Sequence, residues 1–189
     1  EKDAFTVIDI ATSLRHLYLV DTKGAADTIL SLKHFMGPRN IREFYSDNSG
    51  EIKKACKELL FLHDGSQPGM PQTTGIAERN NQAIINNTRV CLLEVGLPLA
   101  IGALCPLPVR VDEFDFPAGE SSWFKTHGKE FEGLRLPFGC KVVFKPSTTK
   151  SDLGKWDEPS TVCVFAGYRI HAGYTWKFEY LIWDLEDFV

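Results

Sequence analysis

The sequence predicts an α/β fold followed by a smaller β-rich module. Strand-like and helix-like patterns alternate up to about residue 105, whereas short β runs separated by glycines and charged turns take over from residue 134. The chain has 189 residues, of which 43% are hydrophobic and 12% aromatic, enough for one ordinary domain with a buried core plus a small module. We therefore expect domains at residues 1–105 and 134–189, joined by a connector at 106–133.

A hairpin and a helix are expected first. Residues 5–10 form an apolar strand interrupted by Asp9, and residues 15–20 have the alternation expected of its hairpin partner. Residues 25–36 carry apolar side chains at helical spacing, and the Gly-Pro pair at 37–38 ends that helix.

The middle of the chain continues the alternation of strands and helices. A strand is expected at 41–45, and a mainly helical segment at 51–62 that could end in a short strand. Residues 65–75 contain three glycines and two prolines, which predicts a loop. A long helix follows at 76–95 and ends at Gly96.

The long helix has two stripes of side chains at helical spacing. One stripe is apolar and is expected to face the core: Ala77, Ile84, Cys91 and Val95. The other forms a second face of the same helix: Glu78, Gln82, Ile85 and Arg89.

Residues 106–133 have a mixed acidic and aromatic composition, which favours a connector with one short helix. Beyond it, β runs at 140–144, 161–168 and 180–183 predict a small barrel or sheet.

Charge, cysteines and hydropathy narrow the class of protein. The net charge is -4, whereas many DNA-binding proteins are basic, so DNA binding by this chain alone is expected to be weak and salt-sensitive. Most of the excess acidity lies in the connector, with 6 acidic and 3 basic residues.

Five cysteines without a Cys-x-x-Cys pair favour buried thiols over disulfides or zinc ligands. The apolar stretches are too short for a membrane span, and the sequence has the character of a fragment of a longer polyprotein.

Asp9 is the first candidate for chemistry, because it interrupts a strand of Phe, Val and Ile. A buried carboxylate needs a partner, and a metal ion is a suitable one. The alternative is that Asp9 lies at the end of the strand and caps a turn near Thr12-Ser13.

Asp47 and Glu78 are the other two candidates, and each also has a simpler explanation. Asp47 follows a strand, where side chains project toward a ligand crevice, but Asp-Asn-Ser-Gly is also good turn chemistry. Glu78 lies in the first turn of the long helix, where a carboxylate favours the helix dipole. The three acids together have the donor chemistry for two divalent metal ions that promote phosphodiester transfer.

Several segments resemble the integrases of copia-type retrotransposons. Residues 44–51, Phe-Tyr-Ser-Asp-Asn-Ser-Gly-Glu, resemble the motif of the second aspartate. Residues 71–81, Pro-Gln-Thr-Thr-Gly-Ile-Ala-Glu-Arg-Asn-Asn, resemble the motif of the third acid and are the most specific part. Residues 7–9 are similar to the strand of the first aspartate, and residues 136–140 and 164–168 resemble the SH3-like barrel that follows the core in these polyproteins.

The resemblance implies an RNase H-like core, a central mixed sheet flanked by helices with the acids converging at one edge, followed by a small SH3-like β-barrel. It implies DNA integration: Mg²⁺ or Mn²⁺, two ions, held by Asp9 with Asp47 and by Asp9 with Glu78, and transfer of element DNA 3′ ends to target DNA. It implies DNA contacts from these residues: Asn48, Lys53, Lys54, Gln72, Thr73, Arg79, Gln82 and Arg89. Lys53 and Lys54 could equally lie on a solvated helix face.

An intact family member is expected to bind element ends and target duplex as a homo-oligomer in the nucleus, without a membrane anchor. This sequence departs from the pattern in four ways. The spacing from Asp47 to Glu78 is short by about one helical turn, and the missing residues fall around 61–67, where a core strand is expected. Thr74 replaces a usual Asn, and a Trp usual after residues 96–98 is absent. No His/Cys zinc module precedes the core.

Two further interpretations remain open at this point. The departures and the acidic balance favour a degenerate integrase that only binds nucleic acid. An RNase H-type hydrolase on the same fold is the third, and cleavage of RNA–DNA hybrids without strand transfer is what would support it.

Overall fold

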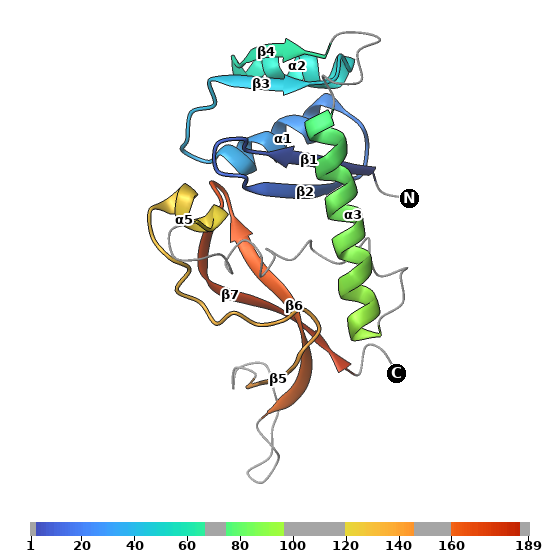
Figure 1. Cartoon of the computed structure of the whole chain (residues 1–189), viewed down its shortest axis with the longest axis vertical. Helices are drawn as coiled ribbons and strands as arrows, with labels where there is room; N and C mark the ends of the chain where they lie inside the picture. The colour runs from blue at the N-terminus through green and yellow to red at the C-terminus, as the bar shows by residue number, and fades with distance from the viewer. Residues whose placement is uncertain (1–2, 67–74, 97–119, 146–159, 186–189) are drawn as a thin grey trace.

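The structure is a computed structural model, and it describes residues 3–66, 75–96, 120–145 and 160–185 (Figure 1). The chain begins with an antiparallel hairpin of β1 (Asp3–Ile8) and β2 (Arg15–Val20), in which Phe5 lies opposite Tyr18. Helix α1 (Ala25–Met36) follows, and Gly37 at its C-cap has a φ of 54°. The predicted hairpin and helix are thus confirmed.

A second β-α-β unit follows α1. Strand β3 (Glu43–Ser46), helix α2 (Gly50–Leu59) and strand β4 (Leu62–Gly65) form it, and the two strands pair in parallel. Helix α2 turns its buried Ala55 and Cys56 inward and packs against α1. A core strand was expected around residues 61–67 in a shortened segment, and β4 occupies that place with only four residues.

The strands of the N-terminal part do not form one continuous mixed sheet. Among the described residues, β1 hydrogen-bonds with β2, β3 with β4, and no ladder joins the two pairs. Figure 1 shows the β3–β4 pair stacked above the β1–β2 hairpin, with α1 between the hairpin and α2. The architecture is mixed α/β as expected, but the expected central sheet is divided in two.

Helix α3 (Gly75–Val95) runs along one side of the molecule (Figure 1). Its buried side chains are Asn80, Ile84 and Leu92. The predicted core-facing stripe is correct for Ile84 but wrong for Ala77, which is exposed. Residues 76–79 of α3 are exposed, and Asn80 is the first buried side chain of the helix.

Among the described residues, the C-terminal part has one short helix and three strands of 4, 11 and 10 residues. Helix α5 (Ser122–His127) has a side-chain N-cap, because Ser121 Oγ accepts from Phe124 N at 3.0 Å. Strands β5 (Lys141–Phe144), β6 (Thr161–His171) and β7 (Thr175–Asp184) form an antiparallel sheet in sequence order. The described residues show an open three-stranded sheet, whereas a closed barrel was expected.

One aromatic-rich core joins the two halves. Trp123 and Phe131, from the expected connector, pack with Tyr168 of β6, and the same cluster extends to Leu14 and Phe35. The other buried members are Val7, Ile29, Leu32, Ala55, Phe165 and Tyr174. The C-terminal sheet is therefore packed onto the N-terminal part.

The turn between β6 and β7 lies directly against the end of α1. Gly173 N donates to His34 O at 2.7 Å. A Cβ on Gly37 would come within 2.3 Å of the Gly173 Cα, so the two backbones approach too closely for any side chain between them. This contact fixes the β6–β7 turn on α1.

The expectation of buried cysteines is confirmed for Cys56 and Cys163, whereas Cys91 and Cys140 are half-buried. Cys56, Cys91, Cys140 and Cys163 are reduced thiols, and Cys105 lies outside the described residues. Burial raises the pKa of the Cys56 and Cys163 thiols, which favours the uncharged form. Within the described ranges, no helix combines the length and apolar character that a membrane span requires.

Candidate active site

Asp9 lies directly after β1 and is half-buried. Its Oδ1 accepts a hydrogen bond from Ala11 N at 3.0 Å, while its own N–H donates to Leu14 O at 2.7 Å. These bonds close the turn from β1 into β2. The expectation of a carboxylate in the centre of a sheet is thus wrong, because the strand ends at Ile8 and leaves Asp9 in the turn.

Asp47 follows β3 and is exposed. Its Oδ1 accepts from Ser49 N at 3.2 Å, which is the aspartate turn that the sequence also allowed. The next residue ties this turn to the second strand of the pair, since Asn48 Nδ2 donates to Ser66 O at 2.6 Å. Gly65 leaves the space for that contact, because a Cβ there would lie 2.6 Å from Asn48 Oδ1.

Glu78 lies in the first turn of α3 and is exposed, as the helical spacing predicted. One contact between α3 and β1 was not revealed by the sequence. Thr6 Oγ1 of β1 donates to Asn81 Oδ1 of α3 at 2.6 Å. Asn81 belongs to the third-acid motif, and its spacing of three residues from Glu78 places both on one side of the helix, which is the signal that would have marked it as a positioning residue.

The described residues do not fit a preformed metal centre. They contain no group of three or more His, Cys, Asp or Glu side chains placed to hold an ion. Asp9 and Asp47 each use one carboxylate oxygen to close a turn, and they follow strands of two different sheets. In this conformation Asp9, Asp47 and Glu78 are not brought together, so no reaction step through a metal is derived from it.

The residues expected to contact DNA are mostly exposed. Lys53 and Lys54 lie on the outer face of α2, and Arg89 lies on α3. Arg79 Nε donates to Gly75 O at 3.0 Å, and Gln82 Nε2 donates to Asn86 Oδ1 at 2.8 Å, so both side chains are held along the helix surface. Gln72 and Thr73 lie outside the described residues.

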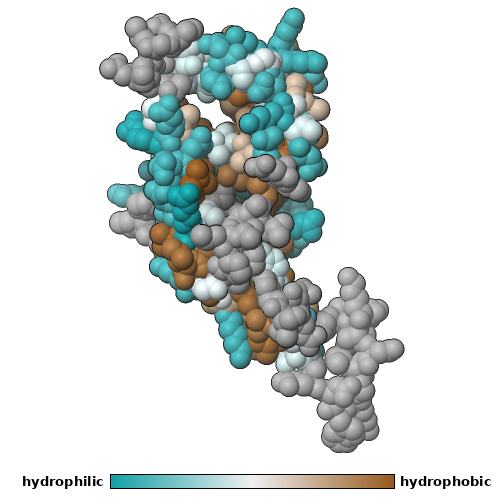
Figure 2. Space-filling model, turned by 90° about the vertical axis from the view of Figure 1, so that its right-hand side faces the viewer, coloured by the Kyte–Doolittle hydropathy of each residue, from teal (hydrophilic) through white to brown (hydrophobic). Residues whose placement is uncertain are grey.

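Helix α3 presents these side chains on a mixed surface. Figure 2 shows the side of the molecule that carries α3, with hydrophilic residues predominating toward the top and apolar residues appearing lower down. The helix exposes Ile85, Val90 and Leu93 as well as the polar stripe. The polar end of the face, near Glu78 and Gln82, is the part suited to a phosphate backbone and its ions.

A histidine cluster lies at the junction of the two halves. His34 Nε2 faces Ile170 O of β6 at 3.2 Å, and its Nδ1 faces Tyr18 Oη at 2.8 Å. A carbonyl oxygen is an acceptor, so the neutral ring donates from Nε2 and accepts from the tyrosine. Burial and the neighbouring His34 lower the pKa of His16 to about 4, and burial lowers the pKa of His34. This junction is therefore built for uncharged imidazoles.

No protein-family model matches the chain. A relative is the retrovirus-related Pol polyprotein from transposon TNT 1-94 of Nicotiana tabacum, which is 27% identical over 197 aligned positions. The alignment covers 95% of this chain and 14% of the polyprotein, so the chain spans about a seventh of that relative's length.

Solved structures resemble the chain in fold. A chain of the simian T-cell lymphotropic virus intasome, in complex with PP2A regulatory subunit B56 gamma, has a TM-score of 0.51 and 14% identity, covering 87% of this chain and 70% of that chain. The HTLV-2 integrase catalytic core domain in complex with magnesium, in its dimeric form, has a TM-score of 0.48 and 18% identity, covering 67% and 84%. Over most of its length the chain is thus distantly similar to a retrotransposon Pol polyprotein, and its α/β fold resembles that of a chain of a retroviral intasome.

Proposed function

We propose that this chain is the integrase segment of a retroelement Pol polyprotein and functions in DNA integration. The activity is a polynucleotidyl transfer that joins the 3′ ends of the element DNA to target DNA. The observation that carries the proposal is the alignment of 95% of the chain with a retrotransposon Pol polyprotein. All three acids of the motif pattern, Asp9, Asp47 and Glu78, are present in that stretch.

The location of the acids supports this function. Asp9 follows β1, Asp47 follows β3, and Glu78 opens α3, so each comes from a separate element as a shared phosphotransfer site requires. Asp47 and Glu78 are exposed and therefore accessible to a nucleic acid. Activity requires the ends of β1 and β3 to approach each other, because the described conformation keeps the acids in separate turns.

The same proposal specifies the cofactor, the partners and the cellular location. The cofactor is Mg²⁺ or Mn²⁺, two ions, and the partners are the element ends, the target duplex and further copies of the chain. Residues 1–105 are the catalytic core, 106–133 the connector, and 134–189 a module whose three strands belong to an SH3-like barrel. The site of action is the nucleus.

A strand-transfer assay with the full chain tests the proposal. The substrate is a labelled duplex with the recessed 3′ end of an element, incubated with plasmid target in Mg²⁺ or Mn²⁺. We expect joined products for the wild type and loss of at least about 100-fold in Asp9→Asn, Asp47→Asn and Glu78→Gln. Asp64→Asn is the matched control, since Asp64 is a carboxylate on β4 outside the proposed site. Hydrolysis of an RNA–DNA hybrid without joining would instead indicate an RNase H-type activity.

A second candidate is DNA binding without catalysis. The specific observation in its favour is that the described residues contain no side-chain group able to hold a metal ion. In this case the chain binds duplex DNA with equal affinity in EDTA and in Mg²⁺, and the three acid variants bind as the wild type does. Joining by the wild type excludes this alternative.

A further inference from the structure

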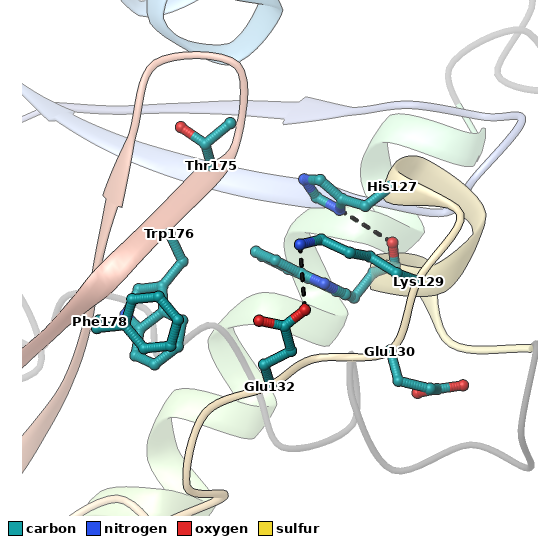
Figure 3. Close-up of a pocket in the computed structure, with 8 residues that line it drawn as sticks. His127, Lys129, Glu130, Glu132, Thr175, Trp176 and Phe178 are labelled. Carbon is teal, nitrogen blue, oxygen red and sulfur yellow. Dashed lines mark hydrogen bonds and ion pairs between the residues drawn. The ribbon is translucent and has the colours of Figure 1, made fainter.

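A small aromatic pocket lies at the side of the C-terminal sheet, away from the acids (Figure 3). It has a volume of about 150 Å³, room for one side-chain head group rather than for a large ligand. Trp123 and His127 of α5 form one wall, with ring centroids 4.0 Å apart. Trp176 and Phe178 of β7 form the opposite wall, with centroids 4.8 Å apart.

A bulge in β7 places Phe178 at this pocket. Tyr168 pairs with Tyr180 and Ile170 pairs with Trp176, so three residues of β7 stand opposite one residue of β6. Phe178, in the middle of the bulge, has a φ of 61° and is 66% exposed. A left-handed backbone and a phenyl ring in water are both unfavourable, and such features are found where a bulge directs a side chain toward a ligand.

The bulge is held in place by specific contacts of its last residue. Trp176 Nε1 donates to Glu179 O at 2.9 Å, which also fixes the orientation of the indole. The Glu179 carboxylate accepts from Arg169 at 3.2 Å and from His171 at 2.8 Å. The position of Phe178 is therefore part of the folded structure.

The pocket already holds an ammonium group of the protein itself. Lys129 Nζ lies 3.2 Å from Glu132 Oε1, and both side chains are exposed, at 63% and 59%. Figure 3 shows this pair between the His127 side and the Trp176–Phe178 side, with Glu130 directed away from it. An exposed ion pair of this kind is weak, so another cation can replace Lys129 at Glu132.

We propose that this pocket binds the methylated ammonium group of a lysine side chain in a peptide partner. Faces of Trp and Phe attract a cation through the ring quadrupole, most strongly when the cation carries little hydration. A methylated ammonium meets that condition better than an ordinary lysine ammonium, which is strongly hydrated. Glu132 supplies the opposite charge at the rim, and the small volume limits the ligand to one head group.

A nucleic-acid base is the competing occupant, because bases also stack on aromatic rings. The charges at the pocket do not favour it. Lys129 is paired with Glu132 and Glu130 is paired with Arg135 at 3.6 Å, so the rim has no excess positive charge for the phosphates on either side of a stacked base. The cation is thus the better match, and this proposal does not depend on the proposed role in DNA integration.

Binding of model peptides to the full chain tests the proposal. The probes are one short peptide with trimethyl-lysine, the same peptide with unmodified lysine, and a neutral isostere in which carbon replaces the ammonium nitrogen. Binding is measured from tryptophan fluorescence and from the indole N–H signals in NMR spectra, at about pH 8, where imidazoles are neutral. We expect the trimethyl-lysine peptide to bind at least about 10-fold more tightly than either control.

Two variants with matched controls separate the pocket from general surface effects. Phe178→Ala is expected to weaken binding about 10-fold, whereas Phe144→Ala, which removes an exposed phenyl ring from β5, leaves binding unchanged. Lys129→Met is expected to strengthen binding several-fold by releasing Glu132, whereas Lys125→Met on α5 has no effect. Circular dichroism verifies that each variant is folded.

Equal binding of the trimethyl-lysine peptide and its carbon isostere would overturn the proposal, since it would remove the cation from the recognition. Absence of binding, or binding unchanged by Phe178→Ala, would overturn it too. Perturbation of the same indole signals by a single-stranded oligonucleotide but not by the peptide would assign the pocket to base stacking. A positive result stands whether or not the chain joins DNA ends.

Discussion

The β3–β4 pair, which is followed by Asp47 at the end of β3, and the C-terminal sheet differ in strand length and in the burial of their side chains. Strands β3 and β4 have four residues each and expose Tyr45 and Leu62, the latter at 73%. Strands β6 and β7 have 11 and 10 residues, and Phe165 of β6 and Tyr174 of the turn between the two strands are buried at 1% exposure. Asp47 thus follows a short strand of a partly exposed pair, whereas the C-terminal sheet contributes large buried rings to the core that the two halves share.

The residues that resemble the integrase motifs are therefore not the residues that stabilise the fold. Asp9 and Asp47 lie in turns, and Glu78 lies in the first turn of a helix. Substitutions in the elements around these residues are expected to be tolerated. The aromatic cluster joins β2, α1, α5 and β6, so a change there disturbs both halves. Substitutions in the two regions are therefore expected to have effects of very different size.

The largest expected contrast is between Phe165→Ala and Leu62→Ala. Removing the buried ring of Phe165 is expected to lower the free energy of unfolding by about 3–5 kcal/mol, because it leaves a cavity in the core. Removing the exposed Leu62 is expected to cost less than about 0.5 kcal/mol. Urea unfolding measures both, and similar losses for the two variants would show that the two halves are equally well packed.

The second prediction concerns pH and the histidine cluster. Burial lowers the pKa of His16 in the folded chain from its ordinary value of 6.5 to about 4, so the unfolded chain binds the proton more readily. Stability is therefore present above about pH 6.5 and lost as the pH falls toward 4, by about 3 kcal/mol in total. Unfolding free energies measured across this window test the prediction.

Two histidine variants test the origin of the pH effect, one at the titrating residue and one as a control. His16→Gln removes the titrating ring from beside Tyr18, His34 and Tyr174, and it is expected to flatten the dependence between pH 6.5 and 4. His63→Gln, on β4, leaves the cluster intact and should retain the slope. A slope that survives His16→Gln would place the proton uptake elsewhere.

Removing a single hydrogen bond between the two halves is expected to have a smaller effect on the free energy of unfolding. Tyr174 Oη donates to Arg15 O at 3.1 Å, across the junction. Tyr174→Phe keeps the ring and removes the donor, with an expected loss of about 1 kcal/mol in the free energy of unfolding. Tyr45→Phe, at an exposed position of β3, is the control and should be neutral. A neutral Tyr174→Phe would show that this bond does not contribute to docking.

Local patterns predicted the local structure well. The hairpin partner at 15–20 and the helix at 25–36 agree with the structure to the residue, because alternation and a Gly-Pro stop depend on neighbouring residues alone. Asp47 was expected after a strand and Glu78 in the first turn of a helix, and the structure places both there. Asp9 was expected inside a strand, and the turn in which it lies had been only the alternative.

Long-range packing was not predictable in the same way. Nothing in the sequence near Trp123 marks it as a partner of Phe131 and Tyr168, so residues of the expected connector became part of the core. The division of the N-terminal strands into two sheets depends on which edges meet in space. The bulge around Phe178 likewise follows from the register between two strands, which no single strand contains.

The measurement that tests the account most directly is strand transfer in Mg²⁺ by the wild type and by Asp9→Asn. Asn can accept the same bond from Ala11 N, so the turn and the stability should change by less than about 0.5 kcal/mol. The account predicts joined DNA products for the wild type and none above background for the variant, at equal unfolding free energy. Joining that survives Asp9→Asn, or DNA binding by the wild type without any joining, would contradict it.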